Sequence, residues 1–285
     1  MGNNRESGTI GRPDARAHAI RSPHQPSVTD HATNRRRARE LIASVLAADC
    51  ACNPRALLAD CTTISIADNM PGRRRYPLRD PSLLIVTTGR GVAIAANEGR
   101  LVWLRDRLAN RERDEIFAAT TIVELAKLVA SDNEIIIGPT VACAASRDTF
   151  RSAPVPPGVD VEIVERDAIP ALYAHPGFEH ALAYRSDGDR SDQIAAVARH
   201  DGEVIGIAAC SDDAEALWQI GVDVIPAAQG AGTGRALVSC LTARILEAGT
   251  VPFYTAAASN IASRTLALGL GYWPAWTALR SAPGP

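Results

Sequence analysis

Lysine is almost absent from this sequence of 285 residues: Lys127 is the only one, and arginine supplies nearly all of the positive charge. A GC-rich bacterial genome is the simplest explanation of that bias. The formal net charge is -2 at pH 7, and aromatic residues make up only 5% of the chain. Proteins that bind nucleic acid or anionic membranes carry a positive excess, often with aromatic residues between the basic ones. We therefore expect no nucleic-acid partner and no membrane partner.

Long apolar runs and paired cysteines are missing as well. No stretch approaches the roughly 18 apolar residues that a membrane-spanning helix needs, and the first 38 residues lack the apolar core of a secretory signal. The six cysteines form neither a CxxC pair nor a disulfide-type spacing. We expect a cytoplasmic protein with reduced thiols and without a bound metal.

What is present divides the chain into segments. Hydrophobic residues make up 46% of the sequence, enough for a sizeable core. Residues 1–37 are polar without a hydrophobic period, which predicts a disordered tail whose arginines lead, solvated, into the first helix. Residues 38–152 predict a small α/β domain. Three prolines and a glycine in residues 153–158 disfavour helix and central strand alike, so residues 153–159 are the predicted linker to a second domain, 160–285.

Hydrophobic periodicity predicts the elements of the first domain. Helices are expected over residues 38–48 and 114–129, and residues 73–79 should form an exposed basic loop. Strands are predicted at residues 62–66, 82–88, 91–96, 101–104 and 134–138. We find no catalytic motif in this domain.

The second domain has a longer series of alternating elements. A hairpin turn is expected at residues 200–203, where Asp201-Gly202 suits the turn that twisted strands require. Helices are predicted at residues 169–184, with an interruption at Pro176-Gly177, and at residues 235–247 and 262–270. Strands are predicted at residues 161–165, 193–199, 204–211, 217–224, 252–258 and 272–279.

A glycine-rich loop, residues 229–235, joins a predicted strand to a predicted helix. Its small residues would let a ligand approach the backbone, and the first N–H groups of a helix together with its dipole favour an anion. The loop lacks the third glycine of a dinucleotide fingerprint, because Arg235 or Leu237 stands there. It also lacks the lysine of a Walker A loop. Both common phosphate loops are therefore excluded.

What remains is Gln-x-x-Gly-x-Gly, made by Gln229, Gly232 and Gly234, with Pro226 just before it. This pattern resembles the signature of the GNAT superfamily of acyl-CoA N-acyltransferases. A second segment, residues 260–272, resembles that family's N-x-x-[AS]-x-x-L-Y-x-x-x-G-[FY] stretch. The resemblance spans about residues 160–280. It implies an α/β (α+β) fold with a mixed, twisted sheet flanked by helices, here preceded by the smaller α/β domain.

The resemblance also implies a function: transfer of an acetyl or short acyl group from acetyl-CoA, as co-substrate, to a primary amine by direct attack in a ternary complex. The oxyanion would be held by a backbone N–H near Val224. A monomer or a homodimer is expected. The implied cofactor-binding residues are Val222, Val224, Gln229, Gly230, Ala231, Gly232, Thr233, Gly234, Arg235, Asn260 and Ser263.

One departure from the family pattern bears on catalysis. Ala267 stands where the family often has a tyrosine that protonates the leaving thiolate. Tyr254 or Tyr272 could substitute for it, or water could. A CoA-binding regulatory or sensor module with little catalysis is the alternative function.

The amine must lose a proton, usually to a carboxylate or histidine. Along residues 215–224 the side chains should alternate between an apolar face and a face that carries Glu215 and Asp223. These two carboxylates are the candidate bases, with Asp223 preferred because it is nearer the loop. Trp273 and Trp276 are expected to pack rather than line a pocket. Small amines, aminoglycosides, amino acids and protein lysines all remain possible acceptors.

Overall fold

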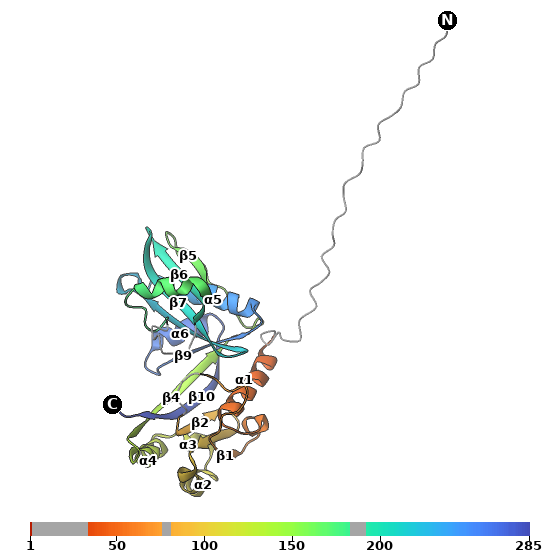
Figure 1. Ribbon diagram of the computed structural model, residues 1–285, viewed down its shortest axis with the longest axis vertical. Helices are drawn as coiled ribbons and strands as arrows, with labels where there is room; N and C mark the ends of the chain where they lie inside the picture. Colours follow the sequence, from red (N-terminus) through yellow and green to blue (C-terminus); the bar gives the residue numbers. More distant parts are fainter. Residues whose placement is uncertain (2–33, 76–80, 183–191) are drawn as a thin grey trace.

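The computed structural model describes Met1 and residues 34–75, 81–182 and 192–285. These residues form one large mixed sheet with helices packed on its faces (Figure 1). The predicted α/β class is confirmed. Most of the predicted tail, residues 2–33, lies outside the described residues, but residues 35–37 already belong to the first helix.

Ten strands make up the sheet among the described residues, in the order β1, β3, β2, β10, β4, β9, β8, β7, β6 and β5. Of the strand pairs that the structure describes, β1 with β3 and β8 with β9 are parallel and the others are antiparallel. The bounds are β1 (Thr62–Ile66), β2 (Leu83–Thr87), β3 (Val92–Ala96), β4 (Glu134–Ala144), β5 (Asp160–Glu165), β6 (Asp192–His200), β7 (Glu203–Ala214), β8 (Leu217–Val224), β9 (Val251–Ala256) and β10 (Trp273–Pro283).

The helices lie on both faces of this sheet (Figure 1). The α-helices are α1 (Arg35–Asp49), α2 (Leu101–Leu108), α3 (Arg113–Ile116), α4 (Ala119–Ala130), α5 (Thr233–Glu247) and α6 (Ile261–Gly269). The 3-10 helices are η1 (Pro54–Leu57), η2 (Glu98–Arg100), η3 (Arg166–Ala174) and η4 (Pro226–Ala228).

The last strand joins the two halves of the chain. β10 lies between β2 and β4, so that Ala278 is opposite Val86 on one side and Thr140 on the other. β4 in turn pairs with β9, which places Val141 opposite Ala256. Residues 153–159 contain no helix or strand. The division into two domains at these residues stays a prediction. The hydrogen bonds of the sheet connect the strands of the first half of the chain to those of the second.

Side chains alternate between the two faces of β8. Ile220 packs in a core with Leu237 and Leu241 of α5, and we call this side of the sheet the α5 face. Leu217 packs on the opposite side, in a core that includes α1 and both Trp273 and Trp276. The predicted alternation is therefore confirmed from Leu217 onward, and the two tryptophans are buried as expected.

Two local predictions hold in detail. The strand predicted at residues 217–224 coincides with β8. In the hairpin between β6 and β7, Asp201 and Gly202 both have positive φ, 50° and 85°. Two successive positive φ values are what a type I′ turn requires, and the Asp-Gly pair supplies them at low cost.

Residues 101–104, predicted as a strand, instead begin helix α2. Leu101, Leu104 and Leu108 are all buried, and their spacing is that of one helix face. The first four residues alone are a short apolar run, which cannot be distinguished from a strand unless Leu108, one turn further on, is included.

Two longer predictions were also wrong in part. The helix expected at residues 169–184 is a 3-10 helix, η3, that ends at Ala174; Pro170 lies inside it and offers no N–H for a regular helix. Residues 183 and 184 lie outside the described residues. The basic loop at residues 73–79 is not wholly exposed, because the Arg74 side chain is 14% exposed and pairs with Asp49; residues 76–79 are not described.

Candidate active site

Strands β8 and β9 separate in the middle of the sheet. Their parallel pairing runs from Leu217 opposite Val251 to Ile220 opposite Tyr254 and ends there. β8 continues to Val224, still paired with β7 on its other edge. β9 continues to Ala256, still paired with β4. The edge of β8 beyond Ile220 therefore faces an opening in the sheet, which we call the split.

The glycine loop lies at the end of β8, next to this split. The Gln229 side-chain amide donates a hydrogen bond of 2.9 Å to the carbonyl of Val224, which ties the loop to the strand end. Gly230 and Gly232 have φ values of 80° and 92°, a conformation that other residues adopt at a cost. Gly232 is the N-cap of α5.

Six consecutive backbone N–H groups of this loop, from Gly230 to Arg235, donate to no residue that the structure describes. The first intrahelical bond at this end comes from Ala236 to the carbonyl of Gly232. The N–H groups lie at the start of a helix of 15 residues, whose dipole adds partial positive charge there. Free donors and positive potential together make this end of α5 an anion-binding site.

The other predicted residues of the loop have packing contacts of their own. A Cβ atom at Gly234 would lie 3.3 Å from Cγ2 of Val224, so this glycine lets α5 approach β8 closely. Thr233 is buried, whereas the Arg235 side chain donates to the carbonyl of Gly269 over 3.2 Å and so links α5 to α6. Val222 and Val224 pack against the core on the α5 face.

Helix α6 borders the other side of the split. The Asn260 side chain accepts a hydrogen bond of 3.0 Å from the N–H of Ser263 and caps the helix. The Ser263 side chain interacts with the hydroxyl of Tyr254. The structure thus brings all eleven predicted cofactor residues to the two sides of one opening; whether each contacts a cofactor stays a prediction.

Asp223 and Glu215, the candidate bases, lie in different environments. Asp223 is on the face of β8 opposite the α5 face, and its carboxylate accepts hydrogen bonds from the N–H groups of His180 and Ala181, at 2.8 and 2.9 Å. Its second oxygen is 2.9 Å from Nδ1 of His180. The His180 side chain is 86% exposed, whereas that of Asp223 is 16% exposed.

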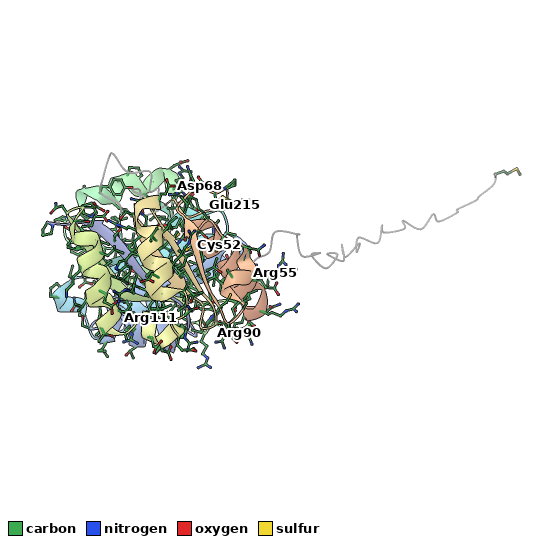
Figure 2. All side chains as sticks on the ribbon, turned by 90° about the horizontal axis from the view of Figure 1, so that it is seen from below. Cys52, Arg55, Asp68, Arg90, Arg111 and Glu215 are labelled. Carbon is green, nitrogen blue, oxygen red and sulfur yellow. The ribbon has the colours of Figure 1, made fainter. Side chains whose placement is uncertain are left out.

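Glu215 is exposed in the turn before β8 rather than in the strand (Figure 2). The alternation predicted along residues 215–224 began two residues too early, because Glu215 and Ala216 form the tight turn between β7 and β8. Eight residues separate Glu215 from Asp223, which is about 26 Å along a strand. The structure does not bring the two carboxylates together, and only Asp223 borders the split.

The two tyrosines considered as proton donors also differ. The hydroxyl of Tyr272 is buried and lies 2.6 Å from Oγ1 of Thr242, and burial raises its pKa strongly. Tyr272 therefore fills a core position. Tyr254 lies at the last pair before the split, and it lines a small cavity together with Ala267. Burial and the nearby Asp223 charge raise the pKa of Tyr254, although its bond to Ser263 lowers it.

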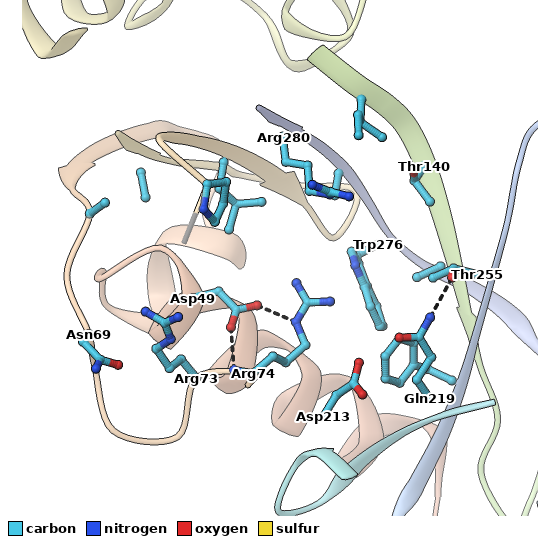
Figure 3. A pocket seen from close by; sticks show the side chains of 18 of the residues that line it. Asp49, Asn69, Arg73, Arg74, Thr140, Asp213, Gln219, Thr255, Trp276 and Arg280 are labelled. Atoms are coloured by element: carbon cyan, nitrogen blue, oxygen red, sulfur yellow. Dashed lines mark hydrogen bonds and ion pairs between the residues drawn. The ribbon is translucent and has the colours of Figure 1, made fainter. Parts of the chain in front are cut away.

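A cavity of about 540 Å³ opens on the side of the sheet opposite α5 (Figure 3). Its walls come from α1, the segment after β1, and strands β2, β3, β4, β7, β8, β9 and β10. Sequence reasoning missed this cavity, because its residues are spread from Asp49 to Arg280. Trp276, predicted to pack, both packs and lines the cavity.

Two kinds of feature are absent from residues 34–75, 81–182 and 192–285. Within these ranges no helix is both long enough and apolar enough to cross a membrane. The same residues contain no group of three histidine, cysteine or acidic side chains placed to hold a metal ion.

Part of the chain matches one protein family. Residues 161–272 match the model of the Acetyltransferase (GNAT) family. The chain is similar to the structure of a GCN5-related N-acetyltransferase from Kribbella flavida, with 22% identity and a TM-score of 0.43, over 56% of this chain and 64% of that one. A GCN5-related N-acetyltransferase-like protein from Streptococcus suis has 19% identity and a TM-score of 0.41, over 56% and 67%.

A structure of a Drosophila protein is similar over more of the chain, 87% of this one and 89% of that one, with 11% identity and a TM-score of 0.43. Comparison with curated proteins finds no match. The family match includes the split, the glycine loop and α6, and it ends one residue before β10. Residues 161–272 of this chain therefore match a domain of the GNAT family of acetyltransferases, a family whose co-substrate is acyl-CoA.

Proposed function

We propose that this protein transfers an acetyl or short acyl group from acyl-CoA to a primary amine by direct attack in a ternary complex. The observation that carries the proposal is the row of six unpaired N–H groups, from Gly230 to Arg235, at the mouth of the split. The row suits a pyrophosphate, because it offers several donors in a positive potential that is open to solvent.

The free edge of β8 gives the rest of the cofactor a place to bind. Beyond Ile220 this edge has no partner strand among the described residues, so its backbone groups are available to the amide groups of an acyl-CoA arm. A backbone N–H near Val224 would hold the oxyanion that forms when the amine attacks the thioester carbonyl. Gln229 supports this arrangement by fixing the Val224 carbonyl.

The amine proton would leave through the pair of Asp223 and His180. Asp223 holds Nδ1 of His180, and the exposed ring leaves Nε2 free to take the proton. A carboxylate that orients a histidine in this way is a common arrangement for a general base. Tyr254 keeps its proton at neutral pH, because its pKa is raised, and could donate a hydrogen bond to the departing sulfur in place of the tyrosine missing at Ala267.

Thiol release from acetyl-CoA, measured with and without added primary amines, tests the proposal. We expect release that depends on the amine and an acylated amine in equal amount by mass spectrometry. Acetyl-CoA binding without release in any amine would favour the alternative, a CoA-binding module that has little catalysis. Absence of binding would exclude both.

A further inference from the structure

We infer that the 540 Å³ cavity is the acceptor site and that it selects an amine bearing one carboxylate, as an amino acid does. The inference rests on the proposed function and names the class of acceptor. It depends on residues that lie outside the family match, because Asp49, Arg74, Trp276 and Arg280 are not among residues 161–272.

The cavity reaches the sheet where the split begins. Gln219 of β8 and Thr255 of β9 both line it, and the Gln219 side-chain amide donates to Oγ1 of Thr255 over 3.0 Å (Figure 3). These residues neighbour Ile220 and Tyr254, the last pair before the strands separate. The glycine loop lies at the start of α5, which packs on the other face. A cofactor and an acceptor could therefore meet at the split from opposite faces.

Arg280 is the clearest binding group in the cavity. Its side chain comes from β10 and points into the cavity (Figure 3). It is half-buried, and it forms no hydrogen bond or ion pair with any described residue. A guanidinium removed from part of its water and left without a partner favours binding of a carboxylate, whose two oxygens match its fork of donors.

Arg74 provides a second positive group in the same cavity. Its Nε donates to Asp49 over 2.6 Å, and its guanidinium lies 5.6 Å from the ring centre of Trp276. Burial alone would lower the pKa of Arg74, but Asp49 and the charge of Asp213 raise it overall, so it remains charged. Its Nη groups donate to no described residue and are directed into the cavity (Figure 3).

The acidic residues of the cavity limit the charge of the ligand. Asp49 already compensates much of the Arg74 charge, and Asp213 lines the same space. Asp68 lines the cavity as well, so a phosphate dianion would meet three carboxylates, whereas a single carboxylate on Arg280 adds only one negative charge. This favours a carboxylate over a phosphate.

An apolar wall completes the site. Trp276 and Phe253 both line the cavity, and their ring centres are 5.1 Å apart. They can pack against the side chain of an acceptor whose carboxylate is on Arg280. The volume leaves room for a large side chain, since ligand pockets of about 300 to 1,000 Å³ hold drug-sized molecules.

The first experiment compares acceptors with the unaltered full chain. Thiol release from acetyl-CoA is measured with L-phenylalanine, with phenethylamine, which lacks only the carboxylate, and with O-phosphoethanolamine. We expect kcat/KM for phenylalanine to exceed that for phenethylamine by about 10- to 100-fold, the discrimination a charged hydrogen-bonded pair provides. Equal values, or a preference for the phosphate, would overturn the inference.

The second experiment uses Arg280→Ala, with Arg105→Ala, an exposed arginine on α2, as the matched control. Arg280→Ala should lower kcat/KM for phenylalanine toward the value for phenethylamine and so remove the preference, while the binding of CoA stays unchanged. Arg105→Ala should behave as the unaltered chain. A preference that survives in Arg280→Ala contradicts the inference, and the comparison of acceptors above does not depend on this variant folding.

Calorimetry separates this inference from the proposed function. If no amine supports thiol release, the proposed function fails, and titration of phenylalanine into the CoA-loaded protein decides the cavity assignment by itself. Binding that is weakened in Arg280→Ala but not in Arg105→Ala supports the cavity as a carboxylate site. If phenylalanine does not bind, or binds equally to all three proteins, the assignment is wrong.

Discussion

The two faces of the sheet at the split are built in opposite ways. On the α5 face the anion site is one continuous stretch of backbone, residues 230–235, in front of a packed core. On the other face the cavity is lined by side chains drawn from α1 and seven strands. The first face uses groups that every residue has, and the second uses particular side chains. We therefore expect the first to bind a constant cofactor and the second to determine the acceptor.

The largest expected effect comes from the carboxylate that borders the split. Asp223→Asn should lower turnover by about 10²- to 10⁴-fold, the usual range for a lost general base or its partner. CoA affinity should hardly change, because the glycine loop is intact. The defect should shrink at high pH, where more of the free amine is already neutral. Steady-state kinetics from pH 6 to 10 would measure this.

Glu215→Gln is the matched control for that substitution. Glu215 is exposed in the turn before β8, so the variant should keep full turnover. Full turnover in Asp223→Asn near neutral pH would show that the strand supplies no base.

The next effect concerns the α5 face alone. Ala231→Glu adds a carboxylate among the free N–H groups, at an exposed residue without positive φ, so the fold should tolerate it. Repulsion of the pyrophosphate should weaken CoA binding by about 100-fold or more, because the new charge competes for the same donors. Ala227→Glu, exposed in η4 but outside the row of N–H groups, should bind CoA normally. Calorimetry with CoA measures both variants. Equal CoA affinities of the two variants would show that the loop does not bind the pyrophosphate.

Sequence reasoning was most successful for the α5 face. Gln229, Gly232 and Gly234 are contiguous, and a strand, a glycine loop and a helix in series determine their arrangement locally. The second motif, which includes Asn260 and Ser263, lies on the other side of the same split. Alternation along β8 also assigned Asp223 to the correct face.

The opposite face could not be predicted in the same way. Arg74 and Arg280 are far apart in the sequence, and both line one cavity because β10 inserts between β2 and β4. No periodicity indicates that pairing. His180 was also missed, because its role depends on the contact with Asp223, and the helix predicted around it ends at Ala174.

A smaller effect is expected on the α5 face, where the core is packed, and it concerns stability at alkaline pH. Tyr272, bonded to Thr242 of α5, has a pKa raised above its ordinary value of 10 by burial. Its contribution to the free energy of unfolding is complete below pH 10 and is lost as the pH rises from there through the folded-state pKa. Tyr272→Phe should cost about 1 kcal/mol at pH 7, because Thr242 loses its partner, and should reduce the alkaline loss. Urea unfolding at pH 7 to 11 measures the free energy of unfolding of both proteins. An equal loss of stability with pH in Tyr272→Phe and in the unaltered chain would contradict this prediction.

The smallest effect is expected at the start of the chain. Deletion of residues 1–33 keeps Asn34, whose side chain caps α1, and removes only the segment that the sequence predicts to be disordered. Melting temperature and the KM for the acceptor should both stay unchanged. A higher KM for the acceptor would mean that this segment contributes to the cavity face.

One kinetic comparison tests most directly whether the two faces bind different substrates. KM for acetyl-CoA and KM for phenylalanine are measured in Ala231→Glu and in Arg280→Ala. We predict that Ala231→Glu raises KM for acetyl-CoA and leaves that for phenylalanine unchanged, and that Arg280→Ala does the reverse. If both substitutions raise the KM for the same substrate, the two faces do not bind separate ligands.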